Sequence, residues 1–417
     1  MYKWSEEQEM VRKAVRDFVD AEIRPRREEL EFGDLPPYDL LRKMFSTFGM
    51  SDMQRASFAK RIAAEKAAAA GETVERSDSG GGRDENAIAF NIIPIIELCR
   101  VCPGMVTAMG VSMGLTAAAV MSKGTIAQKE RWGLDLLTLD KIGAWAITEP
   151  GSGSDAFGSM RSTARRDGDE YVLNGSKTFI TNGPHADTIV FICKLDEGNP
   201  PEERTVLQFV LDRGMPGLEQ SKPLRKMGIH SSPTGELFLD DVRAGKDRLL
   251  GESEEAFKGR GGKDASKATF SMERTGVAAM ALGIVDRCLE LSLAYANDRV
   301  QFGQPIGQFQ LIQLKLAKME VARMNLQNLV FRHIETAAAG EPISFAEASA
   351  SKLYAAQTAT EVALEAVQLF GGNGYMAEFE VEQLARDAKV LQIYAGTDEI
   401  QVSAVARALL AEQAGTA

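Results

Sequence analysis

The segment "AWAITEPGSGSDAFGS" (residues 144–159) has residue types that could bind an anion or the edge of a cofactor. A β-strand is expected to enter it, and the loop that follows is dense in Gly, Ser and Thr. Such a loop exposes backbone N–H groups and hydroxyls, which suit a diphosphate or a flavin edge. Taken alone, a loop of this composition is more often a plain turn. The assignment therefore depends on what else the sequence contains.

A lone carboxylate in apolar surroundings is a second candidate. Glu273 precedes Arg274 in "FSMERTGVAAMALG" and lies among Phe270, Met272 and Val277. A carboxylate near a substrate carbon can act as a general base. From the residues alone, a surface glutamate paired with a nearby arginine is the favoured interpretation. Both alternatives remain open at this stage.

Metal and redox chemistry have little support in the sequence. Cys99 and Cys102 form a C-x-x-C pair, but the pair is single and lies in an apolar segment. The chain has four cysteines and three histidines, so neither a disulfide framework nor a His-rich metal site is expected. We therefore predict no metal site and a reducing compartment, by default the cytoplasm.

The composition is that of a soluble globular protein with two or three domains. Hydrophobic residues make up 44% and charged residues 26% of a 417-residue chain. The net charge of -11 argues against nucleic acid as the main partner, because no basic excess offsets phosphate repulsion. The N-terminus is charged and lacks an apolar signal core. The uncharged stretch 105–121 is interpreted as a buried helix, so no membrane span is expected.

Five segments in chain order resemble motifs of the acyl-CoA dehydrogenase family. They are "TEPGSGSD", "KTFITNG", "DRVQFGQPIGQFQ", "QLFGGNGY" and "IYAGTDEIQ". The resemblance extends over nearly the whole chain. It implies an FAD-dependent enzyme that acts on acyl-CoA thioesters, usually a homotetramer arranged as a dimer of dimers.

The resemblance implies a set of FAD contacts. Phe179 is expected to pack on the isoalloxazine ring, and Thr181 is expected to form a hydrogen bond with the edge of that ring. Arg299 is expected to contact the pyrophosphate of a neighbouring subunit's FAD. By position alone, Phe179 would more often be core and Arg299 a solvated cation, so only the ordered set of motifs supports these roles. The expected cofactor residues are Ile147, Thr148, Gly153, Ser154, Phe179, Ile180, Thr181, Arg299, Phe302, Gln310, Gln368, Gly371, Gly372, Thr397 and Glu399.

The resemblance also implies where the catalytic base lies. The family removes a proton from the α carbon while hydride leaves the β carbon for the flavin, which forms a 2,3-trans double bond. Many members carry the base where this chain has Ala395, and alanine cannot accept a proton. A second group, similar to long-chain and isovaleryl enzymes, has a Glu before an Arg on the first helix of the C-terminal domain. Glu273 and Arg274 match that pattern, so we expect Glu273 to be the base and the backbone N–H of Ala395 to bind the thioester carbonyl.

Substrate contacts and the electron acceptor follow from the same resemblance. Ser154 is expected near the thioester arm and Arg274 near the CoA end of the pocket. Tyr394 is bulky where isovaleryl enzymes have a small residue, which disfavours an acyl group branched close to the thioester. An electron-transferring flavoprotein is the expected acceptor. The alternatives are an acyl-CoA oxidase or flavin monooxygenase on the same scaffold, and a catalytically silent acyl-CoA-binding partner subunit.

These residues must be positioned by an α+β chain of three domains. We predict an N-terminal α-helical domain (1–140), a middle β-barrel-like, flavin-binding domain (141–252), and a C-terminal four-helix bundle (253–417) that carries the base and the tetramer core. Ser5 and Gln8 predict a capping box at the first helix. Asn174 and Gly175 predict a hairpin turn.

The remaining expected elements are defined by their hydrophobic periodicity. The N-terminal helices are expected over 39–70, 105–121 and 126–139, and a polar loop over 71–86. Strands are expected over 187–195, 204–212 and 235–241. The C-terminal helices are expected over 267–297, 310–338, 345–369 and 381–410, the last one broken near Gly396.

Overall fold

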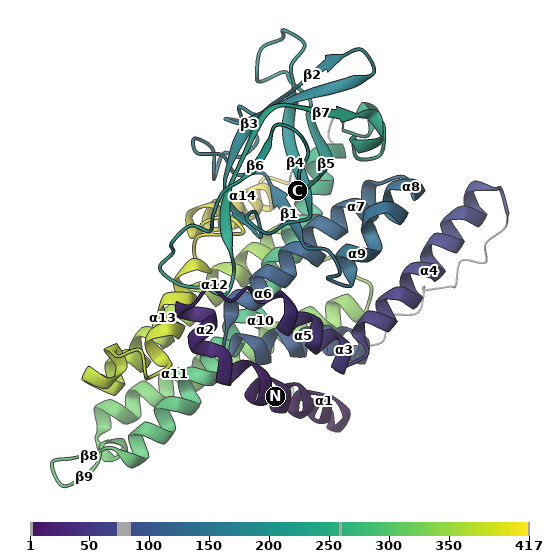
Figure 1. Ribbon diagram of the computed structural model, residues 1–417. Helices are drawn as coiled ribbons and strands as arrows, with labels where there is room; N and C mark the ends of the chain where they lie inside the picture. Colours follow the sequence, from purple (N-terminus) through teal and green to yellow (C-terminus); the bar gives the residue numbers. More distant parts are fainter. Residues whose placement is uncertain (1–2, 73–84, 258–260, 416–417) are drawn as a thin grey trace.

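The computed structural model describes residues 3–72, 85–257 and 261–415, with only the backbone given for 256 and 261–272. Helices form the N-terminal and C-terminal parts, and the intervening segment forms a β-sheet at the top of the view in Figure 1. The predicted α+β fold is confirmed. The predicted boundaries near 140 and 252 fall in the connections between helices and sheet, because the last N-terminal helix ends at Leu137 and the first C-terminal one begins at Gly261.

The N-terminal part is built from short and medium helices. They are α1 (Glu6–Phe18), η1 (Val19–Ile23), η2 (Arg24–Arg26), α2 (Arg27–Phe32), α3 (Tyr38–Thr47), α4 (Met50–Ala69), α5 (Glu85–Cys99), α6 (Pro103–Gly110), η3 (Val111–Ala117), α7 (Ala118–Lys123), α8 (Ile126–Gln128), η4 (Lys129–Gly133) and α9 (Leu134–Leu137). The capping box of α1 is confirmed, since Ser5 Oγ accepts from Gln8 N at 3.1 Å and Gln8 Oε1 accepts from Ser5 N at 3.0 Å. The helix predicted over 39–70 is divided at Gly49, whose φ of +65° ends α3 before α4 begins.

The N-terminal part also includes the segments of the predicted polar loop and of the predicted buried apolar helix. The predicted loop 71–86 lies mostly outside the described residues, and α5 already begins at Glu85. The segment Pro103–Lys123 is long and apolar enough to cross a membrane, with a hydropathy of 1.5. However, 61% of that window is buried inside the structure, which agrees with the interpretation of 105–121 as a buried helix.

The middle part is one seven-stranded mixed sheet. Its strands are β1 (Gly143–Ala146), β2 (Thr163–Asp167), β3 (Glu170–Thr181), β4 (Thr188–Leu195), β5 (Val206–Asp212), β6 (Leu218–Gln220) and β7 (Thr234–Gly245). β5 runs antiparallel along one edge of β4, while β1 and β2 are both parallel to β4 along its other edge. Ala146 pairs with Phe191, and Thr163 pairs with Lys194. The β1–β2 loop (residues 147–162) therefore leaves this edge and returns to it a short distance further along β4.

The hairpin predicted at Asn174 and Gly175 is wrong. Both residues lie inside the continuous strand β3, and the turn between β2 and β3 is at Gly168 and Asp169. A Cβ at Gly175 would lie 2.2 Å from Ser162 Oγ. The glycine is therefore needed where the β1–β2 loop approaches the strand closely. The Asn-Gly dipeptide alone does not distinguish this role from a turn.

The C-terminal part confirms the predicted helices and the break near Gly396. Two short 3-10 turns, η5 (Lys246–Arg248) and η6 (Glu254–Phe257), lead into it from the sheet. Its elements are α10 (Gly261–Asp298), β8 (Val300–Gln301), β9 (Gln304–Pro305), η7 (Ile306–Gln308), α11 (Gln310–Ala338), α12 (Phe345–Phe370), η8 (Gly371–Tyr375), α13 (Val381–Val390) and α14 (Asp398–Gln413). The α13–α14 loop (residues 391–397) separates the last two helices, and Thr397 caps α14 by accepting from Ile400 N.

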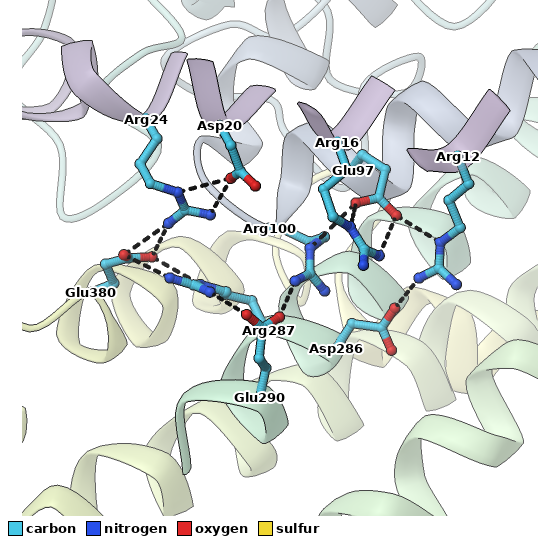
Figure 2. A network of polar contacts seen from close by, with 10 residues as sticks. All are labelled: Arg12, Arg16, Asp20, Arg24, Glu97, Arg100, Asp286, Arg287, Glu290 and Glu380. Carbon is cyan, nitrogen blue, oxygen red and sulfur yellow. Dashed lines mark hydrogen bonds and ion pairs between the residues drawn. The ribbon is translucent and has the colours of Figure 1, made fainter. Parts of the chain in front are cut away.

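A network of buried ion pairs joins the two helical parts (Figure 2). Glu97 of α5 is fully buried and accepts from Arg12 Nε at 2.7 Å and from Arg16 Nε at 2.8 Å, both on α1. Arg12 also pairs with Asp286 of α10 at 2.7 Å, and Arg100 lies 3.3 Å from Glu97. Because every member has an opposite charge beside it, α1 is fixed to α5 and α10 without an unpaired buried charge.

Candidate functional site

Arg274 connects three elements around the expected catalytic residues. Its side chain is buried, and its Nε donates to the carbonyl oxygen of Ala395 at 3.3 Å. Its Nη1 donates to Ser349 Oγ of α12 at 2.7 Å, and the guanidinium carbon lies 4.1 Å from the ring centroid of Phe345. The helix that carries Glu273 is thus fixed to the α13–α14 loop and to α12.

The α13–α14 loop holds Ala395 in an unusual conformation. Ala395 has a φ of +54°, which a non-glycine residue adopts only when its surroundings impose it. Gln401 Nε2 donates to the carbonyl oxygens of Ala395 and Gly396 at 2.9 and 2.8 Å. Within the described part of the chain, the N–H of Ala395 makes no hydrogen bond. The loop therefore has a backbone N–H at Ala395 that is available to a ligand, while the carbonyl oxygen of Ala395 is already hydrogen-bonded.

Glu273 has the properties of a base that works near neutral pH. Burial raises the pKa of Glu273 to about 7, and the nearby cations Arg274 and Lys352 partly oppose that rise. The surface ion pair considered from the sequence is not what the structure contains, because Arg274 is directed at Ala395 and Ser349 instead. A carboxyl group that titrates close to the working pH combines a large ionised fraction with useful basicity.

A buried lysine next to this cluster was not identified from the sequence. Lys352 of α12 is fully buried, and its Nζ lies 3.3 Å from Asp398 Oδ1 at the start of α14. Asp398 N donates to the carbonyl oxygen of Gln392, and Gln392 Nε2 donates back to Asp398 Oδ2 at 3.0 Å. Burial lowers the pKa of Lys352, and the Asp398 carboxylate opposes that shift. Its only sequence signal is a cation on an otherwise apolar helix face.

Tyr394 lies in the same neighbourhood, as expected for a substrate contact. Its hydroxyl lies 3.4 Å from the sulfur of Met280. This contact joins the α13–α14 loop to α10. Burial raises the pKa of Tyr394, and the Glu273 carboxylate contributes to the rise. The ring is therefore neutral and close enough to Glu273 to help shape the space beside it.

The expected flavin contacts of the middle part form a second cluster. Phe179 is 69% exposed, has a φ of +57°, and lies in a register shift between Lys177 and Ile180. The ring is thus displayed from a β-bulge rather than packed in the core. Thr181 ends the same strand. The side chain of Ile180 is buried, so it can meet a ligand only through its backbone.

The β1–β2 loop lies beside this strand and has free space along its backbone. Ile147 has a buried side chain, and Thr148 accepts at its carbonyl oxygen from Thr178 N at 3.0 Å. A Cβ added at Gly153 would meet nothing within 4 Å, and the next residue, Ser154, is exposed. An exposed aromatic ring beside open backbone and hydroxyl groups fits an isoalloxazine ring and a diphosphate.

The other expected cofactor residues lie elsewhere in the chain. Arg299 directly precedes the β8–β9 ribbon and Phe302 lies in the turn between its two strands; Figure 1 places this ribbon at the far end of the helical part from the sheet. Phe302 is 95% exposed with a φ of +52°. The chain therefore does not bring these residues to Phe179. A site that uses both sets requires two copies of the chain.

The rest of the expected set lies near the ends of helices. Gln368 belongs to the last turn of α12, and Gln310 begins α11. Gly371 and Gly372 open η8, and a Cβ at either position would meet nothing within 4 Å. Thr397 and Glu399 lie at the start of α14, and Glu399 is exposed. The structure thus brings Glu273, Arg274, Tyr394 and Ala395 into one neighbourhood, leaves Ser154 on the β1–β2 loop, and divides the expected cofactor residues among separate surfaces.

Comparison with known proteins accounts for almost the whole chain. Three family models match in order: the acyl-CoA dehydrogenase N-terminal domain at residues 5–56, the middle domain at 144–242, and the C-terminal domain at 259–410. The short-chain-specific acyl-CoA dehydrogenase of Megasphaera elsdenii is 37% identical over 336 residues, which cover 81% of this chain and 85% of that protein.

Two solved structures are similar over nearly their full length. The butyryl-CoA dehydrogenase of Megasphaera elsdenii superposes with a TM-score of 0.82 at 33% identity and covers 98% of this chain and 100% of that one. A glutaryl-CoA dehydrogenase of Mycobacterium smegmatis in complex with FADH2 gives a TM-score of 0.81 at 27% identity, over 97% of this chain and 95% of that one. These matches cover all three parts of the fold.

Proposed function

Since the chain belongs to the acyl-CoA dehydrogenase family, we propose that Glu273 is the base of its reaction and that the N–H of Ala395 receives the thioester carbonyl. The chain is an acyl-CoA dehydrogenase, an enzyme that introduces a double bond between the α and β carbons of an acyl-CoA. The observation that carries the base assignment is the Arg274–Ala395 contact. It joins the helix of Glu273 to the loop that lacks a carboxylate.

The proposed roles follow from the chemistry of the α proton. FAD, when bound, accepts the hydride that leaves the β carbon. Glu273 takes the α proton, and a positioned base of this kind contributes about 10²–10⁴-fold. As negative charge develops on the thioester oxygen, the N–H of Ala395 stabilises it, and one such donor contributes about 3 kcal/mol. Burial supports both roles, because charges interact more strongly where water is excluded.

The substrate type is a separate proposal from the placement of the base. The motif "MERT" resembles long-chain and isovaleryl enzymes, but the similar proteins include a short-chain-specific and a butyryl-CoA enzyme, which gives no support to a long-chain or isovaleryl type. We propose an unbranched, short acyl group. Tyr394 beside Glu273 supports this, since its ring leaves little room for a branch near the α carbon. Ser154 is proposed to lie along the thioester arm, and Arg274 to shape the pocket through its bonds to Ala395.

FAD is proposed to lie between two copies of the chain. The residues that would hold it from one copy are in the β1–β2 loop and on β3, and those from the other copy are near β8–β9 and the end of α12. The members of the first set are Ile147, Thr148, Gly153, Ser154, Phe179, Ile180 and Thr181, and those of the second are Arg299, Phe302, Gln310, Gln368, Gly371 and Gly372. Thr397 and Glu399 complete the proposed contacts from the start of α14. The separation of these surfaces within one chain supports a homo-oligomer, for which we propose a dimer of dimers in the cytoplasm.

The proposed electron acceptor is an electron-transferring flavoprotein. An anaerobic screen of the purified protein against straight and branched acyl-CoAs, followed by flavin absorbance, tests the function. We expect butyryl-CoA to bleach the flavin band faster than isovaleryl-CoA. Rapid peroxide production in air would instead indicate an oxidase. The absence of bleaching with every acyl-CoA, in a protein that holds FAD, would indicate a silent binding subunit.

A further inference from the structure

A buried ion pair lies between the two flavin-facing segments of the middle part. Lys177 of β3 is fully buried, and its Nζ donates to Glu149 Oε1 at 2.8 Å and to the carbonyl oxygen of Ile147 at 3.1 Å. Glu149 is also buried, at the start of the β1–β2 loop. The mechanism proposed above uses neither charge. A buried pair costs desolvation energy, so its presence here requires a reason.

Glu149 closes the base of the β1–β2 loop. Its Oε2 accepts from Arg161 N at 2.6 Å, and its Oε1 accepts from Ser162 N at 2.9 Å. Its own backbone exchanges two hydrogen bonds with Ser152, each 3.0 Å long. Glu149 therefore holds the start of the loop through its backbone and the returning end of the loop through its carboxylate. Burial would raise the pKa of Glu149, but Lys177 and these donors hold it below its usual value.

Lys177 fixes the other segment. It is the last residue paired with β7 before the register shift that displays Phe179, and Ile180 is the first residue paired after it. Thr178 N donates to the carbonyl oxygen of Thr148 at 3.0 Å, so the bulge and the loop also touch through their backbones. The ammonium lies 5.2 Å from the ring centroid of Phe191, which fills the space on its other side. The lysine thus ties the start of the bulge to the loop.

We propose that Lys177 and Glu149 are positioning residues that hold the β1–β2 loop and the Phe179 bulge at one fixed spacing for the flavin. This rests on the proposed FAD site. The outward Phe179 has a left-handed φ, and such a conformation persists only when its neighbours over-determine it. Without the pair, the returning end of the loop loses the carboxylate that accepts from Arg161 N and Ser162 N, and the bulge loses its bond to the loop through Lys177. The positions of the β1–β2 loop and of the Phe179 bulge would then no longer be fixed relative to each other.

Four proteins test the proposal: wild type, Glu149→Gln, Lys177→Met, and the double variant. Each is stripped of FAD and titrated with FAD, and flavin circular dichroism and the melting temperature of the apoprotein are recorded. Each single variant should lose at least about tenfold in FAD affinity and change the flavin dichroism. The double variant buries no unpaired charge, so its melting temperature should recover while its FAD affinity stays low. If a single variant fails to fold, the double variant carries the test.

Glu97→Gln is the matched control. It removes another buried, arginine-paired carboxylate, which lies between α1, α5 and α10. It should lower the melting temperature and leave FAD affinity and dichroism unchanged. The proposal would be overturned if the double variant kept wild-type FAD affinity and flavin dichroism. It would also be overturned if Glu97→Gln lost FAD affinity to the same extent as the variants of the pair, since the loss would then follow only from lower stability. A wild-type protein that binds no FAD would instead contradict the cofactor site itself.

Discussion

The guanidinium of Arg274 binds the carbonyl oxygen of Ala395 across 3.3 Å, from the residue directly after Glu273. The residue next to the expected base is therefore hydrogen-bonded to the residue that carries the expected backbone donor, although the two lie far apart in the chain. Ser349 and Gln401 complete this unit from α12 and α14. An alanine in the α13–α14 loop is compatible with catalysis because the loop is held by its carbonyl oxygens and not by its side chain.

Replacement of Arg274 by lysine should separate geometry from charge. Lysine keeps the positive charge but cannot donate to both Ala395 and Ser349 in the fixed fork of a guanidinium. We expect flavin reduction to slow by about 10²-fold, the effect of misplacing one donor to the developing oxyanion, while FAD content is unchanged. Stopped-flow flavin absorbance with saturating acyl-CoA measures the rate. An unchanged rate would show that the contact does not position Ala395.

The pH dependence of kcat/KM should report the base. Because burial raises the pKa of Glu273 to about 7, activity should rise with pH through that value as the carboxyl group ionises. Lys352 opposes this rise in pKa, so Lys352→Met should move the acidic limb to higher pH. Among the residues that the structure describes, the charged groups that act on the pKa of Lys352 are Asp398, Arg274 and Glu273. A limb that does not move would mean that Lys352 has no electrostatic effect on the base.

The Glu97 network should contribute to stability and not to chemistry. Glu97→Gln leaves Arg12, Arg16 and Arg100 without their shared carboxylate, which should cost roughly 3 kcal/mol of unfolding free energy. The arginines outweigh burial and hold the pKa of Glu97 below its usual value. Its contribution is therefore present above the ordinary carboxyl pKa and is lost as pH falls through the folded value.

Urea denaturation at several pH values measures this contribution. The difference between wild type and Glu97→Gln should shrink on acidification. Asp17→Asn, which breaks the exposed pair of Asp17 with Lys13, should cost less than about 0.5 kcal/mol and serves as the control. Equal losses in the two variants would contradict the network's role.

Glu31 should make the protein less stable as pH rises. It is buried on α2, and burial, together with the Asp387 carboxylate, raises the pKa of Glu31 to about 8. The folded protein keeps this proton up to that pH, whereas the unfolded chain loses it at the ordinary carboxyl pKa. Between those two values stability should fall with pH, by up to about 1.4 kcal/mol per unit. Arg386 Nη1, at 3.5 Å, limits the effect.

Thermal unfolding of Glu31→Gln between about pH 5 and about pH 8 tests this pH dependence. The variant lacks the proton-linked loss, so its melting temperature relative to wild type should increase with pH. Glu29→Gln, an exposed position of the same helix, should run parallel to wild type. Parallel curves for Glu31→Gln as well would mean that Glu31 ionises normally.

Local sequence patterns predicted most of the helices and their boundaries. The Ser5 capping box, the long C-terminal helices and the break at Gly396 follow from local patterns, and the structure confirms them. The hairpin predicted at Asn174 and Gly175 was wrong, because the same dipeptide also occurs in a strand that another segment approaches closely. The partners of Lys352 were beyond local patterns, because they are brought together only by the packing of distant helices.

The most direct measurement of the base is flavin reduction in Glu273→Gln. Glutamine keeps the size of the side chain and cannot accept the α proton. With FAD bound and butyryl-CoA added without oxygen, we expect unchanged ligand binding and reduction slowed by at least about 10³-fold. In the Glu273→Gln/Ala395→Glu double variant, part of the rate should return. Reduction of the single variant at the wild-type rate would contradict the assignment of Glu273 as the base.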